Sequence, residues 1–81
     1  MPNLNDLVEV LLSLKNKDEA LDLLRGILTP KELEEIPTRL QIVRMLKSGM
    51  PQHQIAAKLG IGIATVTRGS KELQKKRFKY I

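Results

Sequence analysis

Side chains that can recognise another molecule are concentrated in residues 51–73, PQHQIAAKLGIGIATVTRGSKEL. Val66 and Leu73 lie two helical turns apart and can face inward on one helix. The neighbours that would then point outward are Ala64, Thr65, Thr67 and Arg68. Small, hydroxyl-bearing and basic side chains suit a helix bound in the major groove of DNA. This stretch therefore indicates recognition of a polyanion.

Catalysis has little support in the same residues. The chain has one histidine, His53, and no cysteine, and most of its acids lie in the N-terminal half. No nucleophile has an evident general base, and the absence of cysteine excludes disulfides and thiolate metal sites. We therefore expect no enzyme, no catalytic residue, no metal ligand and no cofactor other than a possible small-molecule effector.

A pair of helices is expected to position the outward residues. Ile55 and Leu59 lie one turn apart on a short helix, and Gly60 can adopt the left-handed conformation that ends it. A second helix then begins near Ile63. An ordinary helical hairpin, with residues 60–62 as a mere turn, is the alternative. The order of short helix, glycine and β-branched residue, within a basic part of the chain, favours a helix-turn-helix.

Charge is divided unevenly along the chain, whose net charge is +5. Residues 1–36 carry eight acids and four bases, whereas residues 37–81 carry one acid and ten bases. A solvated surface is one explanation, but a basic half this strong favours nucleic acid as a partner. The chain has no tryptophan to anchor it at a membrane, no run long enough to span one and no signal-peptide pattern, so we expect a cytoplasmic location without a membrane partner.

The preceding residues are expected to be helical too, which makes the fold class all-α, a small helical bundle. In the first helix, apolar residues recur at helical spacing at Leu4, Leu7, Val8, Leu11 and Leu12. Val10 and Leu14 fall outside this stripe, so one small chain cannot cover the whole apolar surface. A second helix should run from a cap at Asn16 to about Leu28. We therefore expect a homodimer in which the first helix packs against a second chain.

A third helix is expected to begin at Thr29-Pro30-Lys31-Glu32, where a cap threonine, a proline at the first position and a glutamate at the third coincide. Pro37 lacks an amide hydrogen and should kink or interrupt this helix, and Thr38 could cap a new start. The helix should end before Gly49.

The stretch LTPKELEEIPTRLQIVRML, followed by GIGIATVTRGSKEL, resembles the tryptophan-operon repressor family. The resemblance covers about Leu28 to Leu73, and residues 62–65 and 67–70 are its most specific runs. It implies an intertwined homodimer with a C-terminal helix-turn-helix, which binds double-stranded operator DNA when L-tryptophan occupies a pocket beside the reading helix. Two-fold symmetry then predicts a palindromic operator.

The resemblance also assigns site residues. In that family the indole ring lies between two arginines, which correspond to Arg39 and Arg68. The effector-binding residues expected here are Leu28, Thr29, Arg39, Thr65, Arg68, Gly69 and Glu72. The expected DNA-binding residues are Gln52, His53, Ile63, Ala64, Thr67, Arg68 and Lys71. The alternatives are an ordinary surface position for Arg39 and a phosphate contact alone for Arg68.

Some positions depart from the family at the expected ligand pocket. Glu72 stands where the family has a serine near the ligand's amine, and Gly26 stands where a bulky apolar residue is usual. Glu72 can pair with an ammonium group, or with Lys75 or Lys76 on its own helix. The ligand is therefore tryptophan, another amino acid or none.

Other departures concern DNA. His53 and Ala56 stand where the family carries arginine and lysine, so the operator can differ or phosphate contacts can move to Lys58 and the tail. Where the family normally has another helix, this chain has the basic residues 74–81, which can add sequence-independent attraction. The alternative is a solvated tail.

We therefore expect a single domain over residues 1–81, with dimerisation helices in 1–50, the helix-turn-helix in 51–73 and a basic tail in 74–81. The expected function is that of a sequence-specific transcriptional regulator, a repressor promoted by L-tryptophan. The alternatives are a regulator of the same kind that needs no effector, and a helical protein-interaction module built on the leucine-rich first helices.

Overall fold

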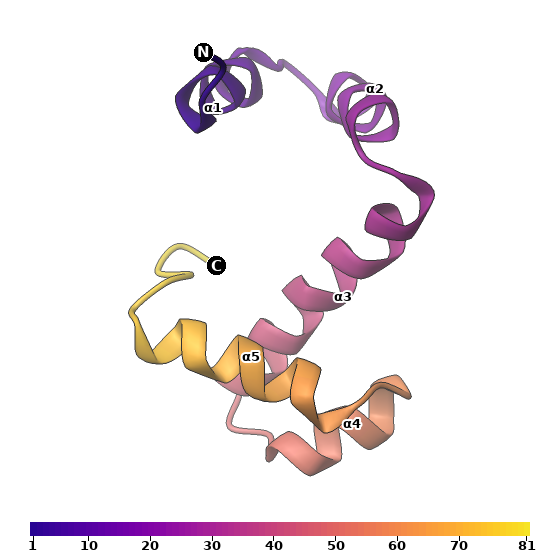
Figure 1. Ribbon diagram of the computed structural model, residues 1–81, viewed down its shortest axis with the longest axis vertical. Coiled ribbons are helices and arrows are strands. Elements are labelled where there is room, and N and C mark those ends of the chain that lie inside the picture. The colour runs from indigo at the N-terminus through magenta and orange to yellow at the C-terminus, as the bar shows by residue number, and fades with distance from the viewer. The chain divides into compact units, whose positions relative to one another are not determined.

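The protein is all-helical in a computed structural model that describes residues 1–81 (Figure 1). Its helices are α1 (Leu4–Ser13), α2 (Lys17–Ile27), α3 (Pro30–Lys47), α4 (Gln52–Leu59) and α5 (Ile63–Gln74). The absence of strands confirms the expected all-α class. No helix combines the length and the apolar character that a membrane span requires. The chain divides into two compact units, Met1–Leu33 and Glu34–Ile81. The predicted division into dimerisation helices, helix-turn-helix and tail stays a prediction.

Polar caps begin the N-terminal helices, and those at Asn16 and Thr29 confirm the sequence predictions. Asn3 caps α1, and the Asn16 side chain accepts a hydrogen bond from the Glu19 amide at 3.0 Å at the start of α2. At α3, Thr29 Oγ1 accepts from the Glu32 amide at 3.2 Å, and Glu32 Oε1 accepts from the Thr29 amide at 2.9 Å. Each cap satisfies amides that lack partners within the helix, so it fixes where the helix begins.

The helices of the first unit leave their apolar side chains uncovered. Neither α1 nor α2 contains a buried residue, and Leu4 and Leu12 are 73% and 81% exposed. Each such side chain gains roughly 1.5–3 kcal/mol when it is fully buried. A second chain that covers these helices would supply this stabilisation, and the homodimer stays a prediction on that ground.

α3 runs through Pro37 without interruption, so the expected interruption and restart are wrong, whereas the alternative of a kink at Pro37 stays a prediction. Thr38 does not cap a new helix, because its hydroxyl donates to the Glu34 main-chain oxygen at 2.9 Å within the same helix. The proline removes only one main-chain hydrogen bond, whose acceptor would be Leu33. The capping box holds the helix before this turn, and buried residues such as Ile42 hold it afterwards.

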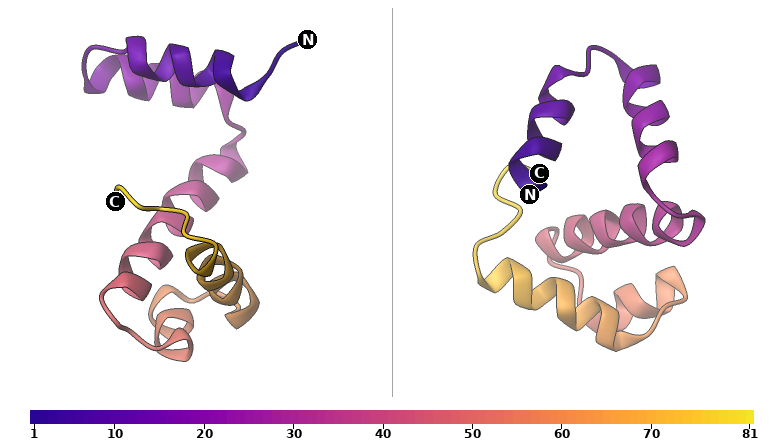
Figure 2. Two further views of the ribbon diagram at one scale, coloured as in Figure 1. Left: turned by 90° about the vertical axis from the view of Figure 1, so that its left-hand side faces the viewer. Right: turned by 45° about the horizontal axis from the view of Figure 1, so that its top comes forward.

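A small apolar core forms where α3, α4 and α5 meet in the second unit (Figure 2). Its buried members are Ile42 and Met45 from α3, Ile55 from α4 and Val66 from α5. Ile55 and Val66 are 0% exposed, which confirms the inward orientation predicted for Val66. Around them pack the partly buried residues Leu46, Met50, Ala56, Leu59 and Ile61.

Two glycines determine how α5 follows α4 and packs on α3. Gly60 ends α4 in the left-handed conformation, with φ of 66°, as predicted. Gly69 lies against α3, where an added Cβ would be 3.1 Å from Cγ2 of Ile42. The missing side chain at Gly69 therefore lets α5 approach α3 closely, which brings residues of the two helices to one surface.

Candidate functional site

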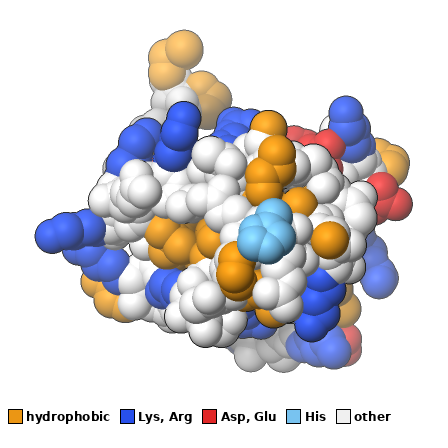
Figure 3. Space-filling view, turned by 90° about the horizontal axis from the view of Figure 1, so that it is seen from below, with side chains coloured by type: hydrophobic (Ala, Val, Ile, Leu, Met, Phe, Trp, Pro, Cys, Tyr) orange, Lys and Arg blue, Asp and Glu red, His pale blue; other side chains and the backbone are white.

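The predicted DNA-binding residues lie on α4 and α5. Most of them are exposed, namely His53, Ile63, Ala64, Arg68 and Lys71. Figure 3 views the protein from the side of α4, with the histidine near the middle of the face, hydrophobic side chains beside it and Lys and Arg side chains farther out. Such a surface is suited to an anionic partner.

Thr67 departs from the predicted outward orientation. It is half-buried, and its hydroxyl donates to Oε1 of Gln52 at 2.7 Å, which joins α5 to the first turn of α4. The same hydroxyl lies 3.0 Å from the main-chain oxygen of Ile63, one turn earlier. Two predicted DNA-binding residues are thus bonded to each other, and Thr67 orients the Gln52 side chain.

We expect Thr67→Val to lower the free energy of unfolding by about 1 kcal/mol, because Oε1 of Gln52 loses a half-buried donor while the β-branched shape is kept. Urea unfolding followed by circular dichroism measures this loss. Thr65→Val is the matched control, since Thr65 is exposed on the same helix, and it should change stability by less than about 0.5 kcal/mol. If Thr67→Val lowers the free energy of unfolding by the same amount in a Gln52→Ala protein as in the wild type, the hydrogen bond between the two side chains does not stabilise the helix pair.

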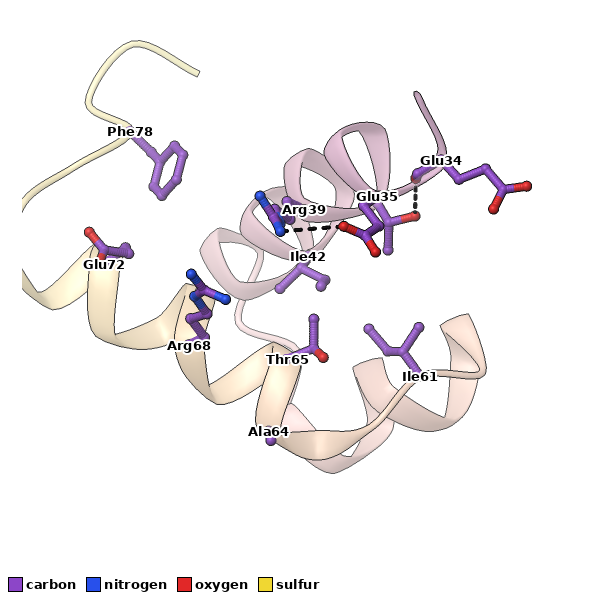
Figure 4. Close-up of a pocket in the computed structure, with 12 residues that line it drawn as sticks. Glu34, Glu35, Arg39, Ile42, Ile61, Ala64, Thr65, Arg68, Glu72 and Phe78 are labelled. Carbon is purple, nitrogen blue, oxygen red and sulfur yellow. Dashed lines mark hydrogen bonds and ion pairs between the residues drawn. The ribbon is translucent and has the colours of Figure 1, made fainter. Parts of the chain in front are cut away.

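A hollow of about 890 Å³ opens beside α3 and α5 in the second unit (Figure 4). Predicted effector-binding residues that line it are Arg39, Thr65, Arg68, Gly69 and Glu72. The other lining residues are Glu34, Glu35, Thr38, Ile42, Ile61, Ala64 and Phe78. Arg39 enters from α3 and Arg68 from α5 (Figure 4). Leu28 and Thr29 belong to the first unit, and their role in effector binding stays a prediction.

Ion pairs hold charged side chains at the hollow. Nη2 of Arg39 lies 3.6 Å from Oε2 of Glu35, one turn earlier on α3. Oε1 of Glu72 lies 3.3 Å from Nζ of Lys75, so of the alternatives for Glu72 the pairing on its own helix is the one present. Both pairs are well exposed and contribute little to stability. Their effect is to orient Arg39 and Glu72 without fixing them rigidly.

The chemistry of the hollow fits a zwitterion with a flat ring. Arg39 and Arg68 offer guanidinium planes that attract an aromatic ring by roughly 0.5–2 kcal/mol each. Arg68 can pair with a carboxylate. Glu72 can pair with the ammonium group of a ligand if its ion pair with Lys75 breaks.

Sequence reasoning missed some members of the site. The pair of Glu35 and Arg39 had a local signal, because acid and base four residues apart on a helix are neighbours. Phe78 had none, since its position in the hollow depends on how the chain turns after α5.

In the second unit, the packed pair α4 and α5, which has a basic surface, lies next to a hollow large enough for a small ligand. These features place the chain in a class of small helical proteins with a surface for an anionic partner and a ligand site beside it. Comparison with known proteins gives the family. The sequence model described as Trp repressor protein matches residues 2–80, and the chain belongs to this family.

Relatives named Trp operon repressor homolog occur in several Vibrio species. The one from Vibrio vulnificus is 51% identical over 55 residues, which cover 67% of this chain and 54% of the relative. The one from Vibrio campbellii is 41% identical over 71 residues, with coverage of 86% and 71%, and the one from Vibrio atlanticus is 36% identical over 75 residues, with coverage of 91% and 76%. The chain therefore spans about half the length of the Vibrio vulnificus relative. No solved structure matches the chain significantly.

Proposed function

We propose that this protein is a sequence-specific DNA-binding transcriptional regulator, a repressor whose operator binding is promoted by L-tryptophan. The observation that carries the proposal is the position of Arg68. It lines the hollow together with Arg39, and it lies on the same helix as the exposed Ile63, Ala64 and Lys71. One helix therefore serves both the ligand and the DNA. Membership of a family of regulators supports the same function.

Ligand binding would act through the orientation of α5. An indole ring stacked between Arg39 and Arg68 replaces the repulsion of two cations with attraction of each to the ring. The bound ligand then bridges α3 and α5 and holds α5 at one angle. A helix held at the angle required by the major groove binds its operator more tightly, so ligand and DNA strengthen each other's binding.

The acting species is a homodimer in this proposal. The uncovered apolar side chains of α1 and α2 support it, as does the small size of the core in the second unit. A dimer with two-fold symmetry places two copies of α5 against two half-sites, which makes the operator palindromic.

A regulator that needs no effector is the second candidate. The ion pair between Glu72 and Lys75 favours it, because a ligand's amine must compete with Lys75 for the carboxylate. The hollow has the same shape in both proposals, and only a ligand-dependent measurement separates them.

Selection of operators from random DNA, with and without L-tryptophan, tests the proposal. We expect inverted half-sites, recovered more strongly with L-tryptophan, and a sedimentation mass of two chains at micromolar protein. Recovery of the same sites at equal strength without L-tryptophan would support the effector-independent regulator. Failure to enrich any sequence would leave the helical interaction module as the better description.

A further inference from the structure

The chain reverses direction directly after α5. The amide of Lys76 donates to the Leu73 oxygen at 2.9 Å, and the amide of Arg77 donates to the Glu72 oxygen at 3.2 Å. This is the Schellman pattern of a helix end, in which the turning residue is left-handed and usually glycine. Here it is Lys76, with φ of 64°. Phe78 also has a positive φ, of 60°. Such values are uncommon outside glycine and call for contacts that hold them.

A lysine from α3 supplies those contacts. Nζ of Lys47 donates to the main-chain oxygen of Phe78, and to that of Ile81 at 2.7 Å. Lys47 lies about two turns beyond Arg39, at the C-terminal end of α3. α5 includes Gln74, the first residue of the predicted tail, and the residues that follow it, 75–81, are thereby tied to the helix that forms one side of the hollow.

The tie sets Phe78 at the hollow. Its side chain is among the lining residues, and Figure 4 shows the ring reaching from the tail toward the part of the hollow near Arg39 and Glu72. Phe78 as a whole is 38% exposed. With Phe78 in place the hollow still measures about 890 Å³, within the range that small-molecule sites occupy. The ring therefore bounds the space and does not fill it.

We propose that Phe78, positioned by Lys47, is an aromatic wall of the ligand site, so that the tail is part of effector binding. This inference rests on the proposed function, which supplies an amino acid with a flat ring as the ligand. Phe78 contacts the bound ligand on the side that the two arginines leave open. It shields from water the ion pairs that the ligand makes with Arg68 and Glu72, which strengthens them. The tail adds, through one side chain, an aromatic ring to the apolar lining that Ile42 of α3 and Ala64 of α5 provide.

Calorimetric titration with L-tryptophan tests this wall. Phe78→Ala should weaken binding about threefold to tenfold, the range expected for an aromatic contact. Lys47→Met, which keeps the apolar stem, should weaken it in the same direction by less. Tyr80→Ala is the matched control: it removes an aromatic ring from the same tail, but Tyr80 is 96% exposed and does not line the hollow, so affinity should stay within about twofold. All variants should keep the wild-type melting temperature.

The outcomes separate the two proposals. If the wild type binds L-tryptophan and Phe78→Ala binds it equally well, the wall is wrong and the proposed effector stands. If Phe78→Ala binds it more tightly, the ring blocks the site and the wall is again wrong. If the wild type binds no L-tryptophan, the effector and the wall both fall.

A second measurement tests the anchoring without a ligand. The chain has no tryptophan, so Phe78→Trp and Tyr80→Trp each introduce a single indole, whose fluorescence is excited selectively at wavelengths that tyrosine does not absorb. We expect acrylamide to quench the Phe78→Trp protein less than the Tyr80→Trp protein, and Lys47→Met to remove the difference. Equal quenching with Lys47 intact would mean that the tail is not held at the hollow, which overturns the inference.

Discussion

Replacing Ile55 by alanine is expected to unfold most of the second unit at room temperature. Ile55 is fully buried between α3, α4 and α5, and truncation of such a residue costs about 2–5 kcal/mol. A core of this size supplies no more than roughly 3–5 kcal/mol of stability in a small protein. The expected loss is therefore comparable to the total stability of the protein. The surfaces that α4 and α5 form are then lost too.

Thermal unfolding followed by circular dichroism, at one fixed protein concentration, measures the effect. Ile63→Ala is the matched control, because it removes the same atoms from an isoleucine of the helix pair that is 49% exposed. It should change stability by less than about 0.5 kcal/mol. Equal melting temperatures for the two variants would contradict the position of Ile55 at the centre of the core.

Local signals in the sequence predicted the helices well, because caps act within one turn. Thr29 and Glu32 satisfy each other's amides without help from the rest of the chain, and Gly60 ends α4 by its own conformation. Both features are readable from residue type and spacing. The inward orientation of Ile55 and Val66 was predictable for the same reason, since helical periodicity sets which residues share a face.

The incorrect or missed features depend on contacts distant in sequence. Pro37 stays inside α3 because packing of residues such as Ile42 holds the helix beyond it. The bond from Thr67 to Gln52 joins different helices, and it ties to α4 a hydroxyl that periodicity alone assigns to solvent. Phe78 reaches the hollow because the chain turns at Lys76, which has a left-handed backbone conformation. This conformation is uncommon for lysine, so residue type does not predict it.

The largest effect on function is expected from the arginines of the hollow. We expect Arg39→Ala to remove most of the stimulation of operator binding by L-tryptophan, a factor of about 5–150 for couplings of the usual size. Its ion pair with Glu35 is well exposed, so the fold should survive its loss. Arg68→Ala should also lower the ligand-free affinity for the operator, and by more than Arg39→Ala does, because only Arg68 lies on the helix proposed to enter the groove.

Reciprocity gives the sharpest test of this coupling. If L-tryptophan raises operator affinity by some factor, the operator must raise L-tryptophan affinity by the same factor, and titrations in both directions measure it. Arg44→Ala is the control, since Arg44 is an exposed arginine of α3 that does not line the hollow, and it should keep the full factor. A wild-type factor near one, with tight ligand binding, would mean that the hollow binds its ligand without biasing α5. The same loss of stimulation in Arg44→Ala as in Arg39→Ala would trace the coupling to the charge of α3, and the stacking of an aromatic ring between Arg39 and Arg68 would then have no part in it.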